Sequence, residues 1–219
     1  MHFAADQVKE QVAKELLKIK AVFLRPDEPF IWASGIKSPV YCDNRLTLSF
    51  PESRDVIEQA LADLVQDKYP EADALMGTST AGIPHAAIAA HLLRMPMGYV
   101  RSGAKDHGRK NRIEGRLEKG WKVVVVEDLI STGGSVLDIV EALREEDAQV
   151  LGIVSIYTYN MKKSIQRLRE ANVENSSLTD FDTVVRIAAK EGYIKENDIQ
   201  RLISFRNNPS DESWIGAKE

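Results

Sequence analysis

A run of four consecutive valines, Val123 to Val126, constrains the fold of this chain more than any other feature of its sequence. A strand in which every residue is apolar is buried on both of its faces. Such strands are typical of parallel sheets that carry helices on both sides. The run therefore predicts a central strand at residues 121–126 of an α/β fold.

Two carboxylates and a glycine-rich turn follow this strand. Glu127 and Asp128 are expected at the C-terminal end of the strand, where ligands bind in open α/β sheets. The turn Ser131-Thr132-Gly133-Gly134-Ser135 then opens a helix, so that backbone N–H groups, hydroxyls and the helix dipole converge. This turn suits a phosphate monoester, and the carboxylates suit sugar hydroxyls, bound directly or through a metal ion. The alternative is a surface turn followed by an ordinary helix N-cap.

Hydrophobic periodicity predicts that strands and helices alternate through the middle of the chain. Helical spacing of apolar residues is found at 6–20, 51–68, 82–94 and 133–146. Short apolar runs predict further strands at 72–77, 97–100 and 150–157. Residues 25–45 and 102–120 are expected to be loops, and only helical patterns follow Met161. This order predicts a mainly parallel sheet flanked by helices.

Composition excludes several classes of protein. The chain has 219 residues and a formal net charge of −4, so no overall basic field points to nucleic acid. Its one cysteine, Cys42, rules out an intrachain disulfide and favours a reducing compartment. No apolar run reaches about 18 residues, and residues 1–10 lack a signal-peptide pattern. We therefore expect a cytoplasmic protein without a membrane partner.

Around the valine run the sequence resembles the type I phosphoribosyltransferases, whose signature is a hydrophobic strand, two acids and a Thr-Gly-rich loop. The resemblance implies that the two acids hold the ribose hydroxyls of phosphoribosyl pyrophosphate and that the loop holds its 5-phosphate. The residues so assigned are Glu127, Asp128, Leu129, Ile130, Ser131, Thr132, Gly133, Gly134 and Ser135. The family's fold implies one domain, residues 1–219, with a small hood formed largely by residues 1–50 and the C-terminal helices from about 161.

A basic segment lies between the second predicted strand and the valine run. Residues 101–116 hold six Lys or Arg against two acids, a local balance of +4 in a chain of net charge −4. Gly103, Gly108 and Gly115 give this segment conformational freedom. A flexible cationic loop suits an anion that must be enclosed and released, here pyrophosphate. The alternative is a solvated, charged surface loop.

Two further motifs resemble the orotate phosphoribosyltransferases within that family. The segment 31–45 contains a Ser-Gly-x-x-Ser-Pro core like that of their hood, and residues 101–108 match their Arg-x-x-x-Lys-x-His-Gly lid. The tail at 192–194 and 208–214 resembles one branch of the same family. The resemblance implies that Arg101, Lys105 and His107 contact phosphoribosyl pyrophosphate, and that Ser131 contacts orotate. Lys37 is a second candidate for orotate, and an exposed lysine without a ligand is the equal alternative.

This chain lacks several positively charged side chains that another branch of the family has. That branch has lysines where this chain has Ala33, Ala81 and Ser102. Those contacts cannot be transferred. Pyrophosphate binding is therefore expected to depend on Lys105, Arg101 and the backbone N–H groups of residues 78–82.

The resemblance implies a mechanism and partners. Lys105, His107 and Asp128 are the expected catalytic residues, and Mg²⁺ is the expected cofactor, held mainly by substrate rather than by protein ligands. The family's lid residues serve the neighbouring subunit, which implies a homodimer. Two alternatives stay open at this stage: a purine phosphoribosyltransferase, which would not need the hood motif, and a nucleic-acid-binding regulator, which should carry a basic face or an added domain.

Overall fold

The computed structural model describes residues 5–31, 35–103 and 112–216. Its centre is a six-stranded sheet in the order β10-β9-β8-β5-β6-β7, in which only β7 is antiparallel to its neighbour. The strands are β5 (Ala74–Thr78), β6 (Met97–Val100), β7 (Ile113–Glu114), β8 (Lys122–Ile130), β9 (Gln149–Thr158) and β10 (Asn175–Asp180). The mainly parallel sheet predicted from the sequence is confirmed.

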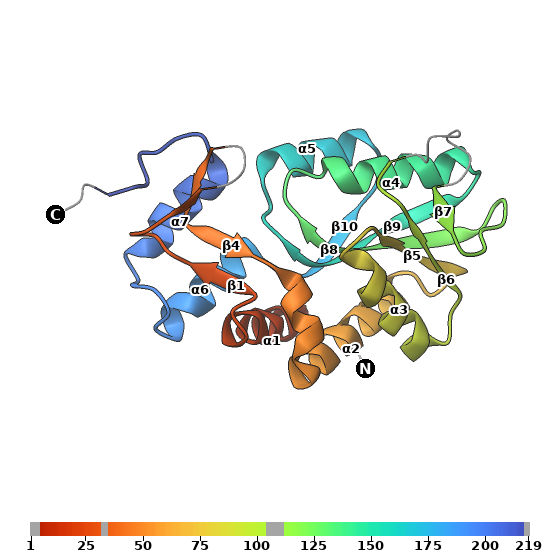
Figure 1. Ribbon diagram of the computed structural model, residues 1–219, viewed down its shortest axis with the longest axis horizontal. Helices are drawn as coiled ribbons and strands as arrows, with labels where there is room; N and C mark the ends of the chain where they lie inside the picture. The colour runs from red at the N-terminus through yellow and green to blue at the C-terminus, as the bar shows by residue number, and fades with distance from the viewer. Residues whose placement is uncertain (1–4, 32–34, 104–111, 217–219) are drawn as a thin grey trace.

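Helices cover both faces of the sheet (Figure 1). On one side lie α2 (Pro51–Lys68) and α3 (Gly82–Leu93), and on the other α4 (Gly134–Glu145) and α5 (Lys162–Glu170). The valine run explains this arrangement, because Val124 and Val126 pack into the core with α2 and α3, whereas Val123 and Val125 pack into the core with α4. All four valines are fully buried, as a strand between two helical layers requires.

The two ends of the chain form a second group of elements, which we call the hood (residues 5–49 and 181–216). It contains the helices α1 (Ala5–Lys18), α6 (Phe181–Lys190) and α7 (Asp198–Asn207), and the 3-10 helix η1 (Asn44–Ser49). Two short antiparallel pairs join them, β1 (Val22–Leu24) with β4 (Val40–Cys42) and β2 (Phe30–Ile31) with β3 (Lys37–Ser38).

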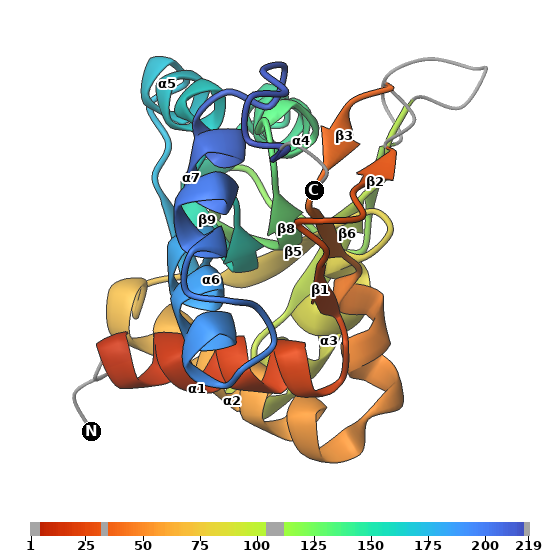
Figure 2. The same cartoon turned by 90° about the vertical axis from the view of Figure 1, so that its left-hand side faces the viewer.

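Contacts between the N- and C-terminal parts of the chain hold the hood together. In Figure 2 α1 lies across the end of α6. The Lys9 ammonium lies 3.0 Å from a carboxylate oxygen of Asp180, and the Thr179 hydroxyl donates to the Lys9 carbonyl over 2.9 Å. Trp214, near the end of the chain, is buried against Phe205 of α7.

Four expectations about local structure were wrong, each for a physical reason. The region 25–45 contains β2, β3 and β4, and the region 102–120 contains β7; these strands of two or three residues are too short to carry a periodic pattern. The segment after Met161 contains β10, an edge strand with a single apolar residue, Leu178. The central strand continues to Ile130 because β9 pairs with it that far.

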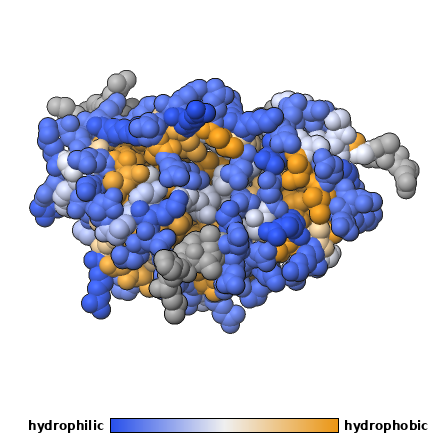
Figure 3. Space-filling view, turned by 180° about the vertical axis from the view of Figure 1, so that it is seen from behind, coloured by the Kyte–Doolittle hydropathy of each residue, from blue (hydrophilic) through white to orange (hydrophobic). Residues whose placement is uncertain are grey.

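The outer surface is mainly hydrophilic. Seen from behind, it shows apolar residues in separate patches between charged and polar ones (Figure 3). Among the residues that the structure describes, no helix combines the length and the apolar character needed to cross a membrane.

Candidate active site

The paired acids lie on the part of β8 that continues past its pairing with β5. The β8–β5 pairing stops at Val126, opposite Gly77, whereas the β8–β9 pairing continues to Ile130. Glu127 and Asp128 therefore lie within a strand, yet past its last paired position with β5, which ends beside Glu127 at Thr78. This corrects the expectation that the acids follow the strand, and it keeps them at the C-terminal edge of the sheet.

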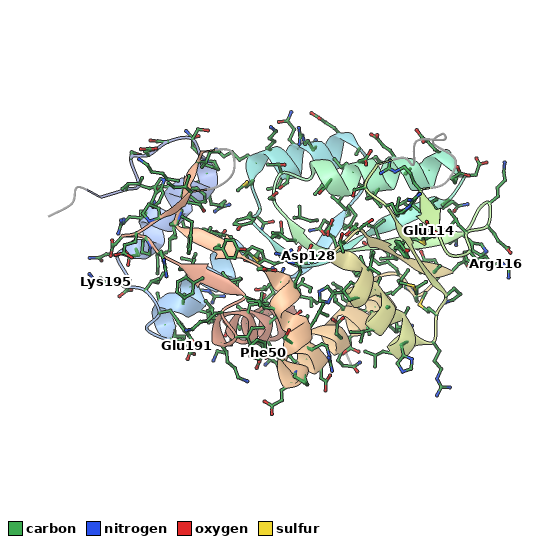
Figure 4. All side chains as sticks on the ribbon, viewed as in Figure 1. Phe50, Glu114, Arg116, Asp128, Glu191 and Lys195 are labelled. Carbon is green, nitrogen blue, oxygen red and sulfur yellow. The ribbon has the colours of Figure 1, made fainter. Side chains whose placement is uncertain are left out.

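A pocket of about 260 Å³ lies at this edge. The two acids line it from β8, Thr80 and Ala81 line it from the turn after β5, and Ser135 lines it from the start of α4. Asp128 is labelled in Figure 4, where it lies between the hood and the helices that cover the sheet. The pocket is thus lined by the two acids, by Ser135 at the end of the glycine-rich turn and by residues 78–81.

Glu127 is the more buried of the two acids, with 7% of its surface exposed. One of its oxygens, Oε1, accepts hydrogen bonds from the Thr78 hydroxyl (2.7 Å) and from the backbone N–H of Asp128 (3.0 Å). Burial, followed by the neighbouring Asp128 carboxylate, raises the pKa of Glu127 to about 8. At neutral pH and without ligand, Glu127 is therefore mostly protonated.

Asp128 connects the sheet to the hood through its backbone. Its carbonyl oxygen accepts a hydrogen bond from Nδ2 of Asn44, which is fully buried at the start of η1. The Cys42 thiol donates in turn to Oδ1 of Asn44 over 3.4 Å. Burial, and next the charge of Asp128, raises the pKa of Cys42 well above its usual value, so the thiol stays protonated. Cys42 is thus a packing residue rather than a nucleophile.

Asn44 is a site residue that the sequence analysis missed. The motif that it adjoins, Ser38-Pro39, identified the segment, but an asparagine after a loop carries no periodic signal. Its importance comes from a contact with Asp128, 84 positions further along the chain.

The glycine-rich turn has the backbone that its sequence predicts. Gly133 has φ +78°, a left-handed conformation that favours glycine, and it caps the N-terminus of α4. Gly134, the first residue of α4, and Ser135 are exposed, so the first N–H groups of this helix lie near solvent at the pocket. Residues 131–135 therefore offer an anion site at a helix N-terminus.

The turn after β5 approaches β8 closely. A Cβ added to Gly82 would lie 2.4 Å from both the Thr78 hydroxyl and the Val126 carbonyl oxygen, so only glycine is accommodated there. This contact places the N-terminus of α3 beside the pocket, on the opposite side from α4. The N-termini of two helices, α3 and α4, thus border one pocket.

The basic segment is described only at its two ends. Arg101 forms an ion pair with Glu114 (3.2 Å), its backbone N–H donates to the Arg112 carbonyl, and Arg112 pairs with Asp138 on α4. Ser102 lines the pocket. Lys105 and His107, the predicted catalytic residues of the lid, lie outside the described residues, as does Ala33.

Of the remaining predicted site residues, some lie at the pocket and others lie away from it. Leu129 lines the pocket, whereas the Ile130 side chain is buried in the core on the α4 side. Ser131 is half-buried and Thr132 is exposed at the start of the turn. Lys37 lies elsewhere: it pairs with Glu212 over 2.7 Å and lines a separate depression of about 890 Å³ in the hood.

The donor atoms at the pocket suit Mg²⁺ only in part. Carboxylate oxygens are its preferred protein ligands, and Glu127 and Asp128 supply them. Among the described residues, however, no group of three or more His, Cys, Asp or Glu could hold a metal ion. A magnesium ion here needs further oxygen atoms from a substrate and from water, which agrees with the way Mg²⁺ commonly binds beside phosphates.

Comparisons with known proteins agree with this geometry. Residues 48–189 match the family described as "Phosphoribosyl transferase domain". The chain is 51% identical over 210 residues to an orotate phosphoribosyltransferase of Bacillus cytotoxicus, covering 96% of this chain and 100% of the relative. It is 52% identical over 208 residues to that of Bacillus subtilis, covering 95% and 96%.

The chain belongs to the orotate phosphoribosyltransferase family. A solved structure of an orotate phosphoribosyltransferase from Aeropyrum pernix superposes on it with a TM-score of 0.73 at 33% identity, covering 84% of this chain and 99% of that one. The type I phosphoribosyltransferase fold expected from the central motif is thereby confirmed, and so is the orotate branch expected from the hood and lid motifs.

Proposed function

We propose that this chain transfers the 5-phosphoribosyl group from phosphoribosyl pyrophosphate to orotate, giving orotidine 5′-monophosphate and pyrophosphate, a step of UMP biosynthesis in the cytoplasm. One observation carries the proposal: two carboxylates and a phosphate-type turn line or border one pocket, and Asn44 connects that pocket to the hood. The membership of the chain in the orotate phosphoribosyltransferases supports the same activity.

The substrate is bound by two chemically different parts of the site. Residues 131–135 receive the 5-phosphate, because the N-terminus of α4 offers N–H donors and a positive dipole. Asp128 and Glu127 accept hydrogen bonds from the ribose hydroxyls. Since Glu127 is mostly protonated before binding, its ionisation accompanies the arrival of the hydroxyl donors.

The reaction needs no covalent enzyme intermediate. A ring nitrogen of orotate attacks the anomeric carbon of the ribose as pyrophosphate departs, and positive charge develops on the sugar. The protein contributes by positioning both substrates and by stabilising the charge of the leaving group. Asp128, together with oxygen atoms of the substrate, would hold Mg²⁺, and the ion would add charge neutralisation at the leaving group.

The pyrophosphate contacts of this chain differ from those of the branch that carries additional lysines. Ala81 and Ser102 line the pocket at two of those positions, and neither side chain carries a charge. Pyrophosphate therefore binds to backbone N–H groups of residues 78–82 and to the lid residues Arg101, Lys105 and His107. These lid residues act at the neighbouring subunit's site in a homodimer.

Ser131 is the better of the two candidates for contact with orotate. It follows β8 directly, two positions after Leu129, which lines the pocket, whereas the Lys37 ammonium is paired with Glu212 in the hood. The orotate carboxylate then depends on Ser131 and on backbone groups rather than on Lys37.

A panel of bases tests the function. We expect nucleotide formation from phosphoribosyl pyrophosphate with orotate, and none with adenine, guanine or hypoxanthine. Omission of Mg²⁺ should lower the orotate rate. Nucleotide formation with a purine and none with orotate would contradict the proposal and favour a purine phosphoribosyltransferase, and ligand-dependent DNA binding without turnover would favour a regulator.

A further inference from the structure

The loop proposed to bind the 5-phosphate has no positively charged side chain of its own. Residues 131–135 contain no lysine or arginine, and Glu127 and Asp128 lie just before them in the chain. A phosphate dianion held there by N–H groups and hydroxyls alone would lie close to two carboxyl groups. A cation from elsewhere in the fold would offset this repulsion.

Helix α5 brings such a cation to the loop. Nη1 of Arg167 donates a hydrogen bond to the backbone carbonyl of Thr132 over 3.3 Å, and it lies 3.2 Å from the position that a Cβ on Gly134 would occupy. Ser164, one turn earlier on α5, lies 3.6 Å from the corresponding position on Gly133. One face of α5 therefore packs against the loop, and the two glycines permit this close approach.

Arg167 differs from Arg112 and Arg201 in the groups that its guanidinium contacts. Arg112 and Arg201 are each paired with carboxylates, at Asp138 and at Asp27 and Asp198. For Arg167 the structure gives, within the ranges it describes, no carboxylate at ion-pair distance. A guanidinium has five N–H donors, and the Thr132 carbonyl uses one of them. Its charge is therefore not offset by a neighbouring acid.

We propose that Arg167 is a positioning residue of the 5-phosphate site. Its hydrogen bond holds the Thr132 carbonyl oxygen on the side of α5. The N–H of the same peptide then points the opposite way, so the loop presents N–H groups rather than oxygen atoms to the phosphate. Its positive charge also lowers the electrostatic cost of placing a dianion near Asp128. This inference rests on the proposed function, because it requires a ligand with a 5-phosphate.

The test uses ligands that differ in the 5-phosphate. Orotidine 5′-monophosphate and phosphoribosyl pyrophosphate carry it, whereas orotate and pyrophosphate do not. For Arg167→Gln we expect the Kd of orotidine 5′-monophosphate and the KM of phosphoribosyl pyrophosphate to rise by about 10-fold, the scale of one charge-assisted hydrogen bond. The KM of orotate, the inhibition constant of pyrophosphate and kcat should stay within about threefold of wild type.

Arg169→Gln is the matched control, since it removes the same charge from an exposed position on the same helix. It should leave all of these constants unchanged. Arg167→Lys keeps the positive charge and can still donate hydrogen bonds, and should recover part of the lost affinity. The thermal midpoint of each variant, measured by calorimetry, should match that of wild type.

The outcomes separate the inference from the function it rests on. If wild type binds orotidine 5′-monophosphate and Arg167→Gln binds it equally well, the inference is overturned and the proposed function stands. Equal losses for orotidine 5′-monophosphate and pyrophosphate, or equal effects of Arg167→Gln and Arg169→Gln, would also overturn the inference. If wild type binds neither orotidine 5′-monophosphate nor phosphoribosyl pyrophosphate, both the proposed function and this inference fail.

Discussion

Nδ2 of Asn44 lies 2.7 Å from the backbone carbonyl oxygen of Asp128, and this hydrogen bond joins the hood to the strand that carries the paired acids. The same asparagine accepts from the Cys42 thiol, so both ends of its amide are used. Because Asn44 is fully buried, neither bond can be replaced by water without a structural change. Asn44 is therefore a direct hydrogen-bonded link between the hood and Asp128, in addition to the apolar core that the hood and the sheet share.

We expect Asn44→Ala to lower the free energy of unfolding by about 1–3 kcal/mol, because the Asp128 carbonyl loses its buried donor. The KM values of both substrates should rise as well, because the hood and Asp128 are no longer joined. Thr47→Ala is a suitable control, since Thr47 is also buried in η1 and its hydroxyl bonds only to the Asn44 carbonyl. It should cost similar stability with a smaller effect on KM; equal effects on KM would contradict a special role for Asn44.

Asp128→Asn should reduce turnover far more than it reduces stability. The side chain lines the pocket, so its loss removes a ligand contact and little packing. The measurements are the initial rate at saturating substrate and the thermal midpoint. Asp147→Asn, which removes an exposed carboxylate paired with Lys119, should change neither the rate nor the midpoint by much. A large loss of stability with full specific activity in Asp128→Asn would remove Asp128 from the site.

The raised pKa of Glu127 predicts a specific dependence of stability on pH. Its pKa of about 8 in the folded chain exceeds the ordinary value of 4.5, so the folded state retains a proton that the unfolded state releases. Glu127 therefore stabilises the fold below pH 4.5, and this contribution is lost as the pH rises to about 8.

Glu127→Gln should remove that dependence, because glutamine cannot ionise. We expect wild type to lose stability relative to Glu127→Gln between pH 4.5 and 8, by about 1.4 kcal/mol per unit of pKa shift. Denaturant unfolding of both proteins across this range measures the difference. A difference that stays constant with pH would mean that Glu127 is ionised at neutral pH.

For the lid, we expect Lys105→Ala to leave stability within about 0.5 kcal/mol, as for substitutions outside the core. If Lys105 stabilises the departing pyrophosphate, kcat and kcat/KM should fall together by about 10²-fold. Steady-state kinetics distinguishes this role from one in which Lys105 only helps to bind phosphoribosyl pyrophosphate. In the latter case the KM of phosphoribosyl pyrophosphate would rise while kcat stayed unchanged.

Mixing two inactive variants tests whether the lid acts across a dimer. A mixed dimer of Lys105→Ala and Asp128→Asn chains holds one site with both changes and one with neither, provided that the lid serves the neighbouring subunit. Part of the activity should then return after subunit exchange. If mass spectrometry shows that subunits have exchanged but no activity returns, the lid acts at the site of its own chain.

The sequence predicted the features that depend on local patterns. The four valines determine a strand buried on both faces, and Pro51 marks the start of α2, which has the bounds 51–68 expected for it. The pocket at Glu127 and Asp128 was predictable because the acids and the glycine-rich turn are adjacent in the chain.

Features that depend on contacts between distant segments were not predictable. β10 is polar and becomes a strand only because β9 offers it a partner. Asn44 and Arg167 reach Asp128 and Thr132 from segments 84 and 35 positions away. Neither residue belongs to a motif, so only the folded chain reveals its contact.

The construction of the hood from both ends of the chain has a consequence for synthesis on the ribosome. The residues that line the pocket have all emerged once residues 74–158 are synthesised, but α1 must wait for β10, α6 and the stretch ending near Trp214. A nascent chain therefore has the residues that line the pocket before the hood packs beside them. A premature stop codon or proteolytic removal of the last helices would leave a chain that has the pocket residues and lacks the complete hood.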